Sequence, residues 1–305
     1  MAPETTGNDV SRLVTIGLPA YNRPRLLQTA LESLQAQTYR NIEILVSDNA
    51  SPDPEVARIV ERLARDDNRI RYRRRDANYG AAANFKSVLD CAASPYFMWA
   101  SDDDVWERHF VERCLSLLDQ YPRAQMAFGT VDNINLDDVT VRRYEGFSKY
   151  MSTGINSSDA LRFVHEAEIF GKANLVYGLF RTAAIREVVK KYWEAVGFER
   201  WGGDIVLIFA FICRYPIACS DEVLLHKRVI SRETSPIDPR VYFVPPMEFA
   251  SYVRRHVAVA PNWNIALRTA GALARRSVVE TFGAMRQPAF WQKVSQCFAE
   301  RRPGT

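Results

Sequence analysis

The chain has 305 residues, of which 47% are hydrophobic and 25% are charged, and its formal net charge is +4. This is the composition of a globular protein long enough for a large core, and so small a charge excess does not favour a nucleic-acid partner. The longest uninterrupted apolar run, residues 205–213, is far shorter than the roughly 20 residues of a membrane-spanning helix.

Residues 1–12 are polar and predict a flexible tail, without the apolar segment of a secretory signal. The five cysteines show no CxxC spacing and lie mostly in apolar surroundings, as reduced core thiols do. We therefore expect a cytoplasmic protein with neither a disulfide framework nor a zinc site.

From residue 13 the chain alternates between apolar runs and amphipathic segments. Strands are predicted at residues 13–22, 41–51, 69–75, 95–101 and 124–134, and helices at residues 24–37, 54–67, 80–91 and 105–120. Strands that alternate with helices of about ten to fifteen residues indicate parallel β-α-β units with right-handed crossovers. In such a sheet ligands bind beyond the carboxyl ends of the strands, so the loops at those ends are the candidate site.

After residue 134 the alternation breaks down. The predicted elements are a hairpin strand in 140–150, helices at 157–170, 183–196 and 204–215, and a strand near 173–180. For residues 204–215 periodicity does not separate a helix from a buried strand, and the preceding glycines favour the helix. We expect an α/β domain in two halves, 13–134 and 135–240, followed by a helical extension over residues 241–305.

Polar side chains follow each predicted strand of the first half. The four loops are Pro-Ala-Tyr-Asn-Arg at 19–23, Ser-Asp-Asn-Ala-Ser at 47–51, Asn78-Tyr-Gly80 with Asn84, and Ser-Asp-Asp-Asp at 101–104. Because the carboxyl ends of parallel strands meet at one edge of a sheet, we expect these groups to converge on one crevice.

Three consecutive aspartates, residues 102–104, end a buried strand although like charges repel one another. A divalent cation would neutralise them, and Mg²⁺ and Mn²⁺ take one or two protein carboxylates and leave other positions for substrate phosphates. The alternative is that Ser101 or Asp102 caps the following helix, which accounts for one or two acids more easily than for three.

The second loop permits two interpretations. Asp48 and Asn49, followed by Ser51 and Pro52, suit a turn and a helix start, whereas in a nucleotide site Asp48 would accept a hydrogen bond from a base N–H. The chain has neither GxGxxG nor GxxxxGK[ST], so a phosphate group bound here would need a metal to hold it.

The segments VTIGLPAYNRPRLLQTALESLQAQT, IEILVSDNAS, NYGAAAN and the aspartates before VW follow one another in this order. Together they resemble family 2 glycosyltransferases of the GT-A fold, closely over residues 13–120 and more loosely to about 235. The resemblance implies metal-dependent transfer of a sugar, with inversion, from a nucleoside-diphosphate sugar to a hydroxyl acceptor. UDP is the default nucleotide, and Mn²⁺ or Mg²⁺ is the cofactor.

The resemblance also assigns roles to residues. The first half would bind the nucleotide sugar and residues 135–240 the acceptor. The family's DxD falls on Ser101 and Asp103, which makes Asp103 the expected metal ligand, Asp104 an alternate ligand and Asp102 a ribose or metal contact. The other implied nucleotide contacts are Pro19, Ala20, Tyr21, Arg23, Asp48 at the base, Asn78 and Gly80.

In the second half the resemblance places the catalytic base on Asp204, because YGLFR at 177–181 is followed by WGGDIVLIF at 201–209. A carboxylate can deprotonate the attacking hydroxyl, although Asp204 could also simply cap its helix. A basic segment follows with His226, Lys227, Arg228 and Arg232. It is expected to lie over the diphosphate, with Arg228 as a contact, and the alternative is a solvated loop.

Other functions compete with this interpretation. A sugar nucleotidyltransferase shares the sheet and the metal, but has a Gly-rich N-terminal loop that GLPAYNRP does not resemble. A non-catalytic nucleotide-binding protein would keep the pocket alone. The basic strand 69–75 alternates arginines with Ile70 and Tyr72, so a solvated face is favoured over nucleic acid. The C-terminal helices could pack on the core, form a homodimer or contact a membrane peripherally; packing is the default.

Overall fold

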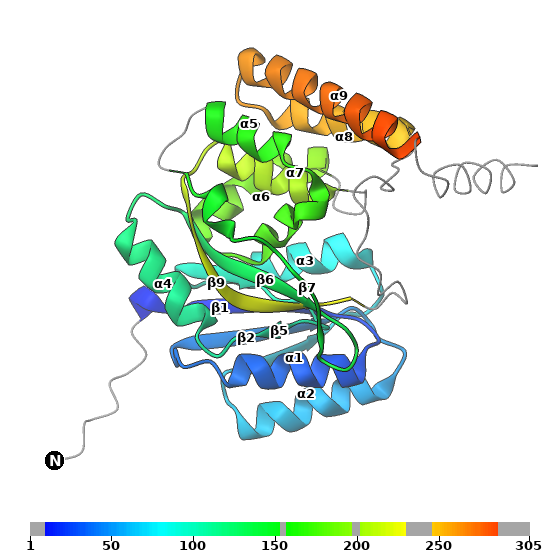
Figure 1. The fold of residues 1–305 in the computed structure, drawn as a ribbon. Coiled ribbons are helices and arrows are strands. Elements are labelled where there is room, and N and C mark those ends of the chain that lie inside the picture. The colour runs from blue at the N-terminus through cyan, green and yellow to red at the C-terminus, as the bar shows by residue number, and fades with distance from the viewer. Residues whose placement is uncertain (1–9, 153–156, 197–201, 230–245, 286–305) are drawn as a thin grey trace, which may run out of the picture.

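A nine-stranded sheet organises the computed structural model, which describes residues 10–152, 157–196, 202–229 and 246–285 (Figure 1). The strands are β1 (Val14–Ala20), β2 (Ile42–Asp48), β3 (Ile70–Arg74), β4 (Tyr96–Trp99), β5 (Val105–Trp106), β6 (Met126–Ile134), β7 (Thr140–Arg143), β8 (Leu179–Arg181) and β9 (Ile217–Arg228). The helices are α1 (Pro24–Gln35), α2 (Pro54–Asp66), α3 (Gly80–Cys91), α4 (Phe110–Gln120), α5 (Ser157–His165), α6 (Thr182–Val196), α7 (Gly203–Ile212), α8 (Pro246–Val259) and α9 (Trp263–Met285). Short 3₁₀ helices lie at Val10–Arg12, Phe147–Tyr150, Glu168–Phe170 and Lys172–Tyr177.

The strand order is β3-β2-β1-β4-β8-β6-β9-β5, with β7 paired to β6. Strands β1 to β4 run parallel, and the antiparallel β8 joins them to β6 and β9, which run in the same direction as β1. Six of the nine strands therefore point one way, as predicted for a mostly parallel sheet. The carboxyl ends of all six lie at one edge, which places the loops after β1, β2, β3 and β4 together.

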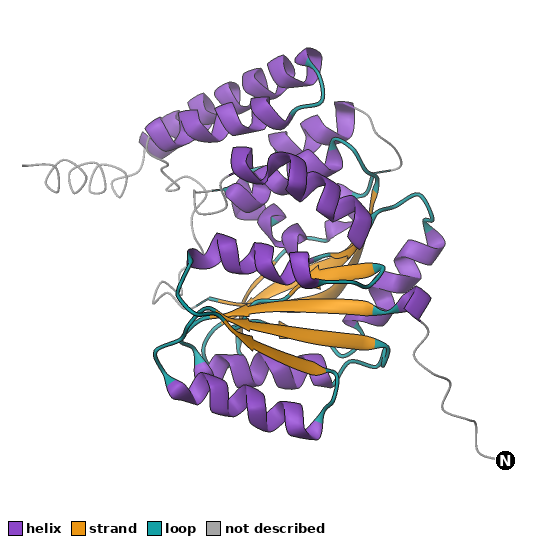
Figure 2. Ribbon diagram, turned by 180° about the vertical axis from the view of Figure 1, so that it is seen from behind, coloured by secondary structure: helices purple, strands orange, loops and turns teal. Residues whose placement is uncertain are grey.

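The first half forms these layers because its apolar residues follow the two expected periods. All seven residues of β1 are buried, while α2 buries one face through Val56, Ile59 and Val60. Helix α2 begins at Pro54, and Asp53 caps it by accepting a hydrogen bond from the Glu55 N–H at 2.9 Å. Helices α1 and α2 cover one face of the sheet and α3 covers the other (Figure 2).

Gly17 in β1 lies where the sheet and α3 approach most closely. A Cβ atom there would be 2.7 Å from Val88 Cγ2 and 2.9 Å from Phe97 Cε2. We expect Gly17→Ala to lower the free energy of unfolding by about 1–3 kcal/mol, because neither side chain can move without disturbing the core. The control is Gly271→Ala, since nothing lies within 4 Å of a Cβ at that position of α9. Urea denaturation that gives both variants the wild-type midpoint would contradict this.

Three predicted elements differ from the structure, two of them where β5 pairs with β9. The helix predicted at 105–120 begins at Phe110, because Val105 and Trp106 form β5 and pair antiparallel with β9. The basic segment interpreted as a loop is the end of that strand, which continues through Arg228, while Arg232 lies outside the described residues. The strand expected near 173–180 is mostly a 3₁₀ helix, followed by the short β8.

The helical part of the second half packs above the sheet as two layers (Figure 1). Helix α7, which the preceding glycines favoured, is buried along almost its whole length, and the α8–α9 hairpin lies over α5 and α7. Buried polar contacts fix the hairpin: Tyr252 donates to Glu168 Oε1 at 2.6 Å, and Arg276 donates to the Val164 carbonyl at 2.7 Å. Among the described residues, no helix combines the length and the apolar character needed to cross a membrane.

Candidate active site

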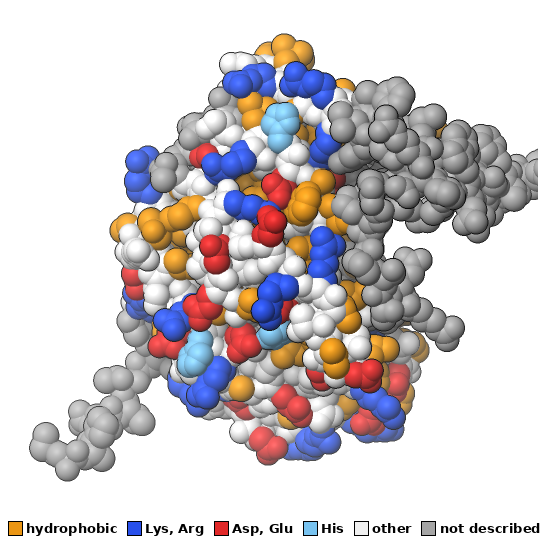
Figure 3. All heavy atoms as spheres, viewed as in Figure 1, with side chains coloured by type: hydrophobic (Ala, Val, Ile, Leu, Met, Phe, Trp, Pro, Cys, Tyr) orange, Lys and Arg blue, Asp and Glu red, His pale blue; other side chains and the backbone are white. Residues whose placement is uncertain are grey.

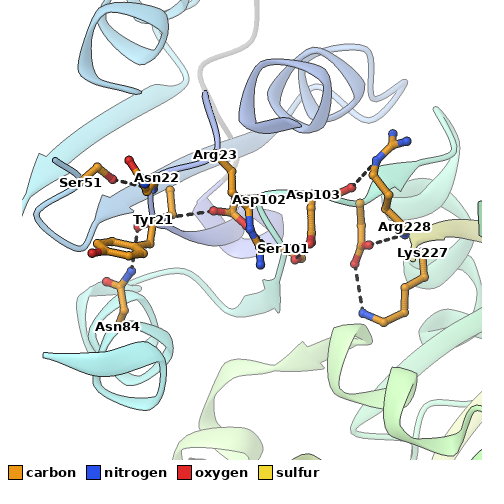
Figure 4. A network of polar contacts seen from close by, with 12 residues as sticks. Tyr21, Asn22, Arg23, Ser51, Asn84, Ser101, Asp102, Asp103, Lys227 and Arg228 are labelled. Atoms are coloured by element: carbon orange, nitrogen blue, oxygen red, sulfur yellow. Dashed lines mark hydrogen bonds and ion pairs between the residues drawn. The ribbon is translucent and has the colours of Figure 1, made fainter. Parts of the chain in front are cut away.

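Four strand-end loops meet at the carboxyl edge of the sheet, as the sequence predicted. The loop after β1 turns at Asn22, whose φ is 55°, and the loop after β2 turns at Ala50, whose φ is 58°. The Asn22 N–H donates to Ser51 Oγ at 2.9 Å and joins these two loops (Figure 4). Because positive φ is uncommon for residues other than glycine, two such residues at one edge show that the loops are held in a specific conformation.

Asn49 ties three of the loops together, although its role was not recognised in the sequence. Its backbone N–H donates to the Ala20 carbonyl at 2.9 Å, and its Nδ2 donates to Asn78 Oδ1 at 2.6 Å. Its Oδ1 accepts from the Tyr79 N–H at 3.2 Å. Asn78 and Gly80, predicted to lie by a nucleotide, are thereby placed beside the β1 loop. Tyr21 and Tyr79 remain 42% and 50% exposed there.

Asp102 connects the loop after β4 with the loop after β1. Its Oδ2 accepts from the Tyr21 N–H at 2.9 Å, and its Oδ1 lies 3.2 Å from Arg23 Nη1. Burial raises the pKa of the Asp102 carboxyl to about 6, although the Tyr21 N–H and Arg23 oppose the rise. Asp102 therefore positions the β1 loop, a role that the helix-capping interpretation did not include.

Asp103 lies at the centre of the aspartate cluster. Its Oδ2 is 2.6 Å from Arg23 Nη1, and its Oδ1 accepts a hydrogen bond from the Ser101 hydroxyl. The side chain is 12% exposed, whereas that of Arg23 is 45% exposed. The partly exposed guanidinium of Arg23 thus covers the largely buried carboxylate of Asp103.

Asp104 is fully buried and faces the end of β9. Its Oδ1 accepts from the Arg228 N–H at 2.8 Å, and its Oδ2 lies 3.6 Å from Lys227 Nζ. Burial raises the pKa of the Asp104 carboxyl, opposed by Lys227. These contacts make Asp104 a less favourable metal ligand than Asp103.

Arg228 is committed to protein contacts. Its three donor nitrogens bond to the Asp103 carbonyl at 2.9 Å, the Asn135 carbonyl at 2.7 Å and the Asp138 carboxylate at 2.6 Å. Its side chain is only 2% exposed. This arrangement favours a structural role for Arg228 over the predicted nucleotide contact. Its neighbour Lys227 is then the better candidate for a basic group that contacts a ligand.

Lys227 lies between the aspartate cluster and the first turn of α7. Its Nζ is 4.9 Å from the centre of the Tyr177 ring, and its side chain is 33% exposed. Burial lowers the pKa of Lys227, but Tyr177, Asp104 and Asp103 together raise it by a larger amount. The net shift of the pKa is therefore upward. The ammonium group is therefore charged at neutral pH.

Asp204 occupies the first turn of α7, just after Gly202 with its φ of 69°. Its Oδ1 accepts from the Ile205 N–H at 2.8 Å, so it contacts the helix start without being the N-cap residue. Burial raises the pKa of the Asp204 carboxyl, opposed by that N–H and by Lys227. Lys227 thus acts electrostatically on both Asp204 and the aspartate cluster, although these lie in the two different halves predicted for the domain.

Asp48 is fully covered by its own neighbours. Its carboxylate accepts from the Ser51 N–H at 2.8 Å, from the Tyr72 hydroxyl at 2.8 Å and from Arg74 Nη1 at 2.6 Å. These contacts form the turn that the first sequence interpretation predicted. The second interpretation, a contact with a nucleotide base, depends on Arg74, whose side chain is 45% exposed. A base N–H could reach Asp48 only if Arg74 moved aside.

The oxygen ligands at this site suit a hard divalent cation that takes most of its other ligands from a bound substrate. Among the described residues, no three His, Cys, Asp or Glu side chains form a ready metal site. Asp103 and the adjacent Ser101 hydroxyl nevertheless offer oxygen ligands, and Mg²⁺ commonly takes only one or two carboxylates alongside substrate phosphates. Arg23 would have to release Asp103 for such an ion to bind.

Comparison with known proteins gives one family and one fold. A model described as "Glycosyl transferase family 2" matches residues 15–191. The chain is 31% identical over 238 residues to an uncharacterized glycosyltransferase of Rickettsia typhi, which covers 75% of this chain and 67% of that protein. It is 34% identical over 92 residues to the GalNAc(5)-diNAcBac-PP-undecaprenol beta-1,3-glucosyltransferase of Campylobacter jejuni, covering 30% of this chain.

The chain spans 29% of the Campylobacter protein and 14% of an uncharacterized protein of Sinorhizobium fredii to which it is 31% identical. Among solved structures, S. aureus TarS 1-349 in complex with UDP-GlcNAc superposes with a TM-score of 0.61 at 14% identity, covering 86% of this chain and 71% of that one. Mannosyltransferase PcManGT from Pyrobaculum calidifontis in complex with GDP-Man and Mn²⁺ gives 0.50 at 16% identity, covering 99% and 85%. At these identities the likeness establishes the fold.

Proposed function

The chain belongs to glycosyl transferase family 2 and has the GT-A fold, and from this premise we propose that it transfers a sugar from a nucleoside-diphosphate sugar to a hydroxyl acceptor with inversion. The observation that carries the proposal is the convergence of Arg23, the aspartate cluster and Lys227 at the carboxyl edge of the sheet. The acceptor would be a glycan, a lipid-linked saccharide or a small molecule.

The nucleotide would lie over the loops after β1, β2 and β3, with Pro19, Ala20, Tyr21, Asn78 and Gly80 around it. The two exposed tyrosines, Tyr21 and Tyr79, offer faces on which a base can stack. Arg23 and Arg74 now neutralise the carboxylates of Asp103 and Asp48. Because both arginines are partly exposed, they can move when a ligand takes their place. UDP is the nucleotide that we propose first.

Asp103, with the Ser101 hydroxyl, would hold a divalent cation, either Mn²⁺ or Mg²⁺. When bound, that ion would neutralise negative charge on the diphosphate and so make it a better leaving group. Asp102 would hold the Tyr21 N–H and the β1 loop in place. PcManGT, whose structure contains Mn²⁺ with its nucleotide sugar, supports a metal of this kind.

Asp204 would act as the general base. As the acceptor oxygen forms its bond to the anomeric carbon, its proton passes to the Asp204 carboxylate. The bond between the anomeric carbon and the diphosphate oxygen breaks at the same time, and its electron pair leaves with the nucleoside diphosphate. Attack opposite the leaving group inverts the configuration. The Lys227 ammonium would then stabilise the negative charge that develops on the diphosphate.

Lys227→Met is expected to weaken nucleoside-diphosphate binding by about tenfold or more, because a charged hydrogen-bond donor is lost. Lys227→Arg should retain most of the affinity, since it keeps the charge beside Asp104. Lys86→Met is the matched control, because Lys86 pairs with Asp90 on the exposed side of α3. Isothermal titration with UDP measures all three. If Lys227→Met binds UDP as tightly as the wild type does, Lys227 does not contact the donor.

The proposed function is tested by thermal shift with a panel of nucleoside diphosphates, each with and without Mn²⁺. We expect one nucleotide to raise the melting temperature more in the presence of metal. The matching nucleotide sugar should then be hydrolysed slowly without an acceptor, because a transferase slowly transfers its sugar to water when no acceptor is present. A nucleotidyltransferase would instead consume a nucleoside triphosphate and release pyrophosphate, and binding without any turnover would indicate a non-catalytic protein.

A further inference from the structure

The outward face of α9 exposes large apolar side chains. Trp263 and Leu267 lie one turn apart and are 78% and 68% exposed, whereas Ile265 and Leu273 on the inner face are buried. Their positions are fixed, because α9 is docked through the buried contacts of Arg276 with the Val164 carbonyl and with Glu168. Trp263 and Leu267 therefore form a small exposed apolar patch on a rigid face.

The same face carries basic groups around a hollow. A cavity of about 440 Å³ between α5 and α9 is lined by Leu161, His165, Leu267, Arg268, Gly271 and Arg275. No described carboxylate lines it or pairs with Arg268 or Arg275. Figure 3 shows Lys and Arg side chains gathered with hydrophobic ones at the end of the molecule formed by α5 and α9.

We propose that this face of α9 binds an anionic phospholipid surface. Trp263 and Leu267 would enter the interfacial region of the bilayer, and a lipid phosphate would sit in the hollow between Arg268 and Arg275. Tryptophan and arginine on one side of a helix that does not span the membrane are the residues that such a contact uses. The inference goes beyond the proposed function, because it requires neither a donor nor an acceptor.

A second copy of the chain is a less suitable occupant. In a two-fold symmetric dimer formed through this face, the arginines of one protomer would lie near those of the other, since an isologous interface pairs a patch with itself. The described part of the face offers no acidic side chain in the hollow to offset that repulsion. Lipid phosphates supply the negative charge that a second copy lacks.

The test is sedimentation of the full chain with vesicles of phosphatidylcholine and phosphatidylglycerol, and with vesicles of phosphatidylcholine alone. We expect binding to the first and little to the second. Arg268→Glu combined with Arg275→Glu should lower the partition coefficient at least about 25-fold, because each basic residue near an anionic surface contributes about fivefold. Trp263→Ser should also weaken binding to the mixed vesicles.

The control is Arg62→Glu combined with Arg65→Glu, two exposed positions on α2 with the same change in net charge. Equal loss of binding in both double variants would overturn the proposal, because net charge alone would then explain it. Equal binding to neutral vesicles would overturn it as well. So would light scattering that finds a wild-type dimer and a monomeric Trp263→Ser variant, since the face would then bind a second copy. Far-UV circular dichroism verifies that each variant is folded.

Discussion

Asp204→Asn is expected to lower kcat by about 10²–10⁴-fold, the usual contribution of a general base, while the dissociation constant of the donor stays unchanged. The amide has nearly the same shape and can still accept from the Ile205 N–H, so the start of α7 should be preserved. What is lost is the ability to take a proton from the acceptor hydroxyl. Single-turnover kinetics and donor titration by calorimetry measure the two effects separately.

The control for this variant is Asp159→Asn, the same change in the first turn of another helix, α5. It is expected to leave kcat at the wild-type value. If Asp204→Asn weakens donor binding as much as it slows turnover, the residue belongs to the donor site and is not the base.

The pH dependence gives an independent check of Asp204. A base must be deprotonated, and burial raises the pKa of this carboxyl above its usual 3.8, so kcat should fall on the acidic side at a higher pH than for an ordinary aspartate. Lys227 opposes that rise, and Lys227→Met should therefore move the acidic limb to still higher pH. An unchanged limb in that variant would show that Lys227 does not influence the base.

Asp103→Ala is expected to reduce kcat/KM by about 10³-fold or more, which corresponds to about 4 kcal/mol of transition-state stabilisation. Unlike Asp204→Asn, it should also abolish the tightening of nucleoside-diphosphate binding by Mn²⁺. The reason is that Asp103 is the acid of the cluster that is both partly exposed and adjacent to a second oxygen donor, Ser101. Calorimetry with and without Mn²⁺ measures this difference.

Asp137→Ala, a substitution of an exposed aspartate in the loop after β6, is the control and should retain the effect of Mn²⁺. A chelator should reduce the wild-type protein to the nucleotide affinity of Asp103→Ala. If the variant still binds more tightly with Mn²⁺, then Asp102 or Asp104 holds the ion, and the assignment of Asp103 is wrong.

The local signals in the sequence predicted the first half of the fold closely. Helix α3 begins at Gly80 and ends at Cys91, as predicted, and β1, β2 and β3 fall inside their predicted ranges. These elements are recognisable because hydrophobic periodicity within one segment reflects the face that the segment buries. The predicted division of the chain into functional halves, and the roles of the site residues, stay predictions.

The C-terminal half was less predictable because its decisive contacts are remote in sequence. Strand β5 is only Val105–Trp106, and it exists because β9, more than a hundred residues later, lies beside it. Nothing within residues 105–120 signals that pairing, so the segment resembles the start of a helix. Pairing with β6, which is also remote in sequence, turns the basic segment after Leu225 from a loop into a strand.

By itself the sequence determined the parallel β-α-β order and the loops in which polar groups would gather, since both follow from patterns inside short segments. Only the tertiary structure decided which side chain of each loop faces the crevice. Successive residues of a strand point to opposite faces, so once His226 to Arg228 continue β9, Arg228 is buried and Lys227 is turned toward Asp104 and Tyr177. That choice depends on strand pairing across the whole chain, which no local pattern records.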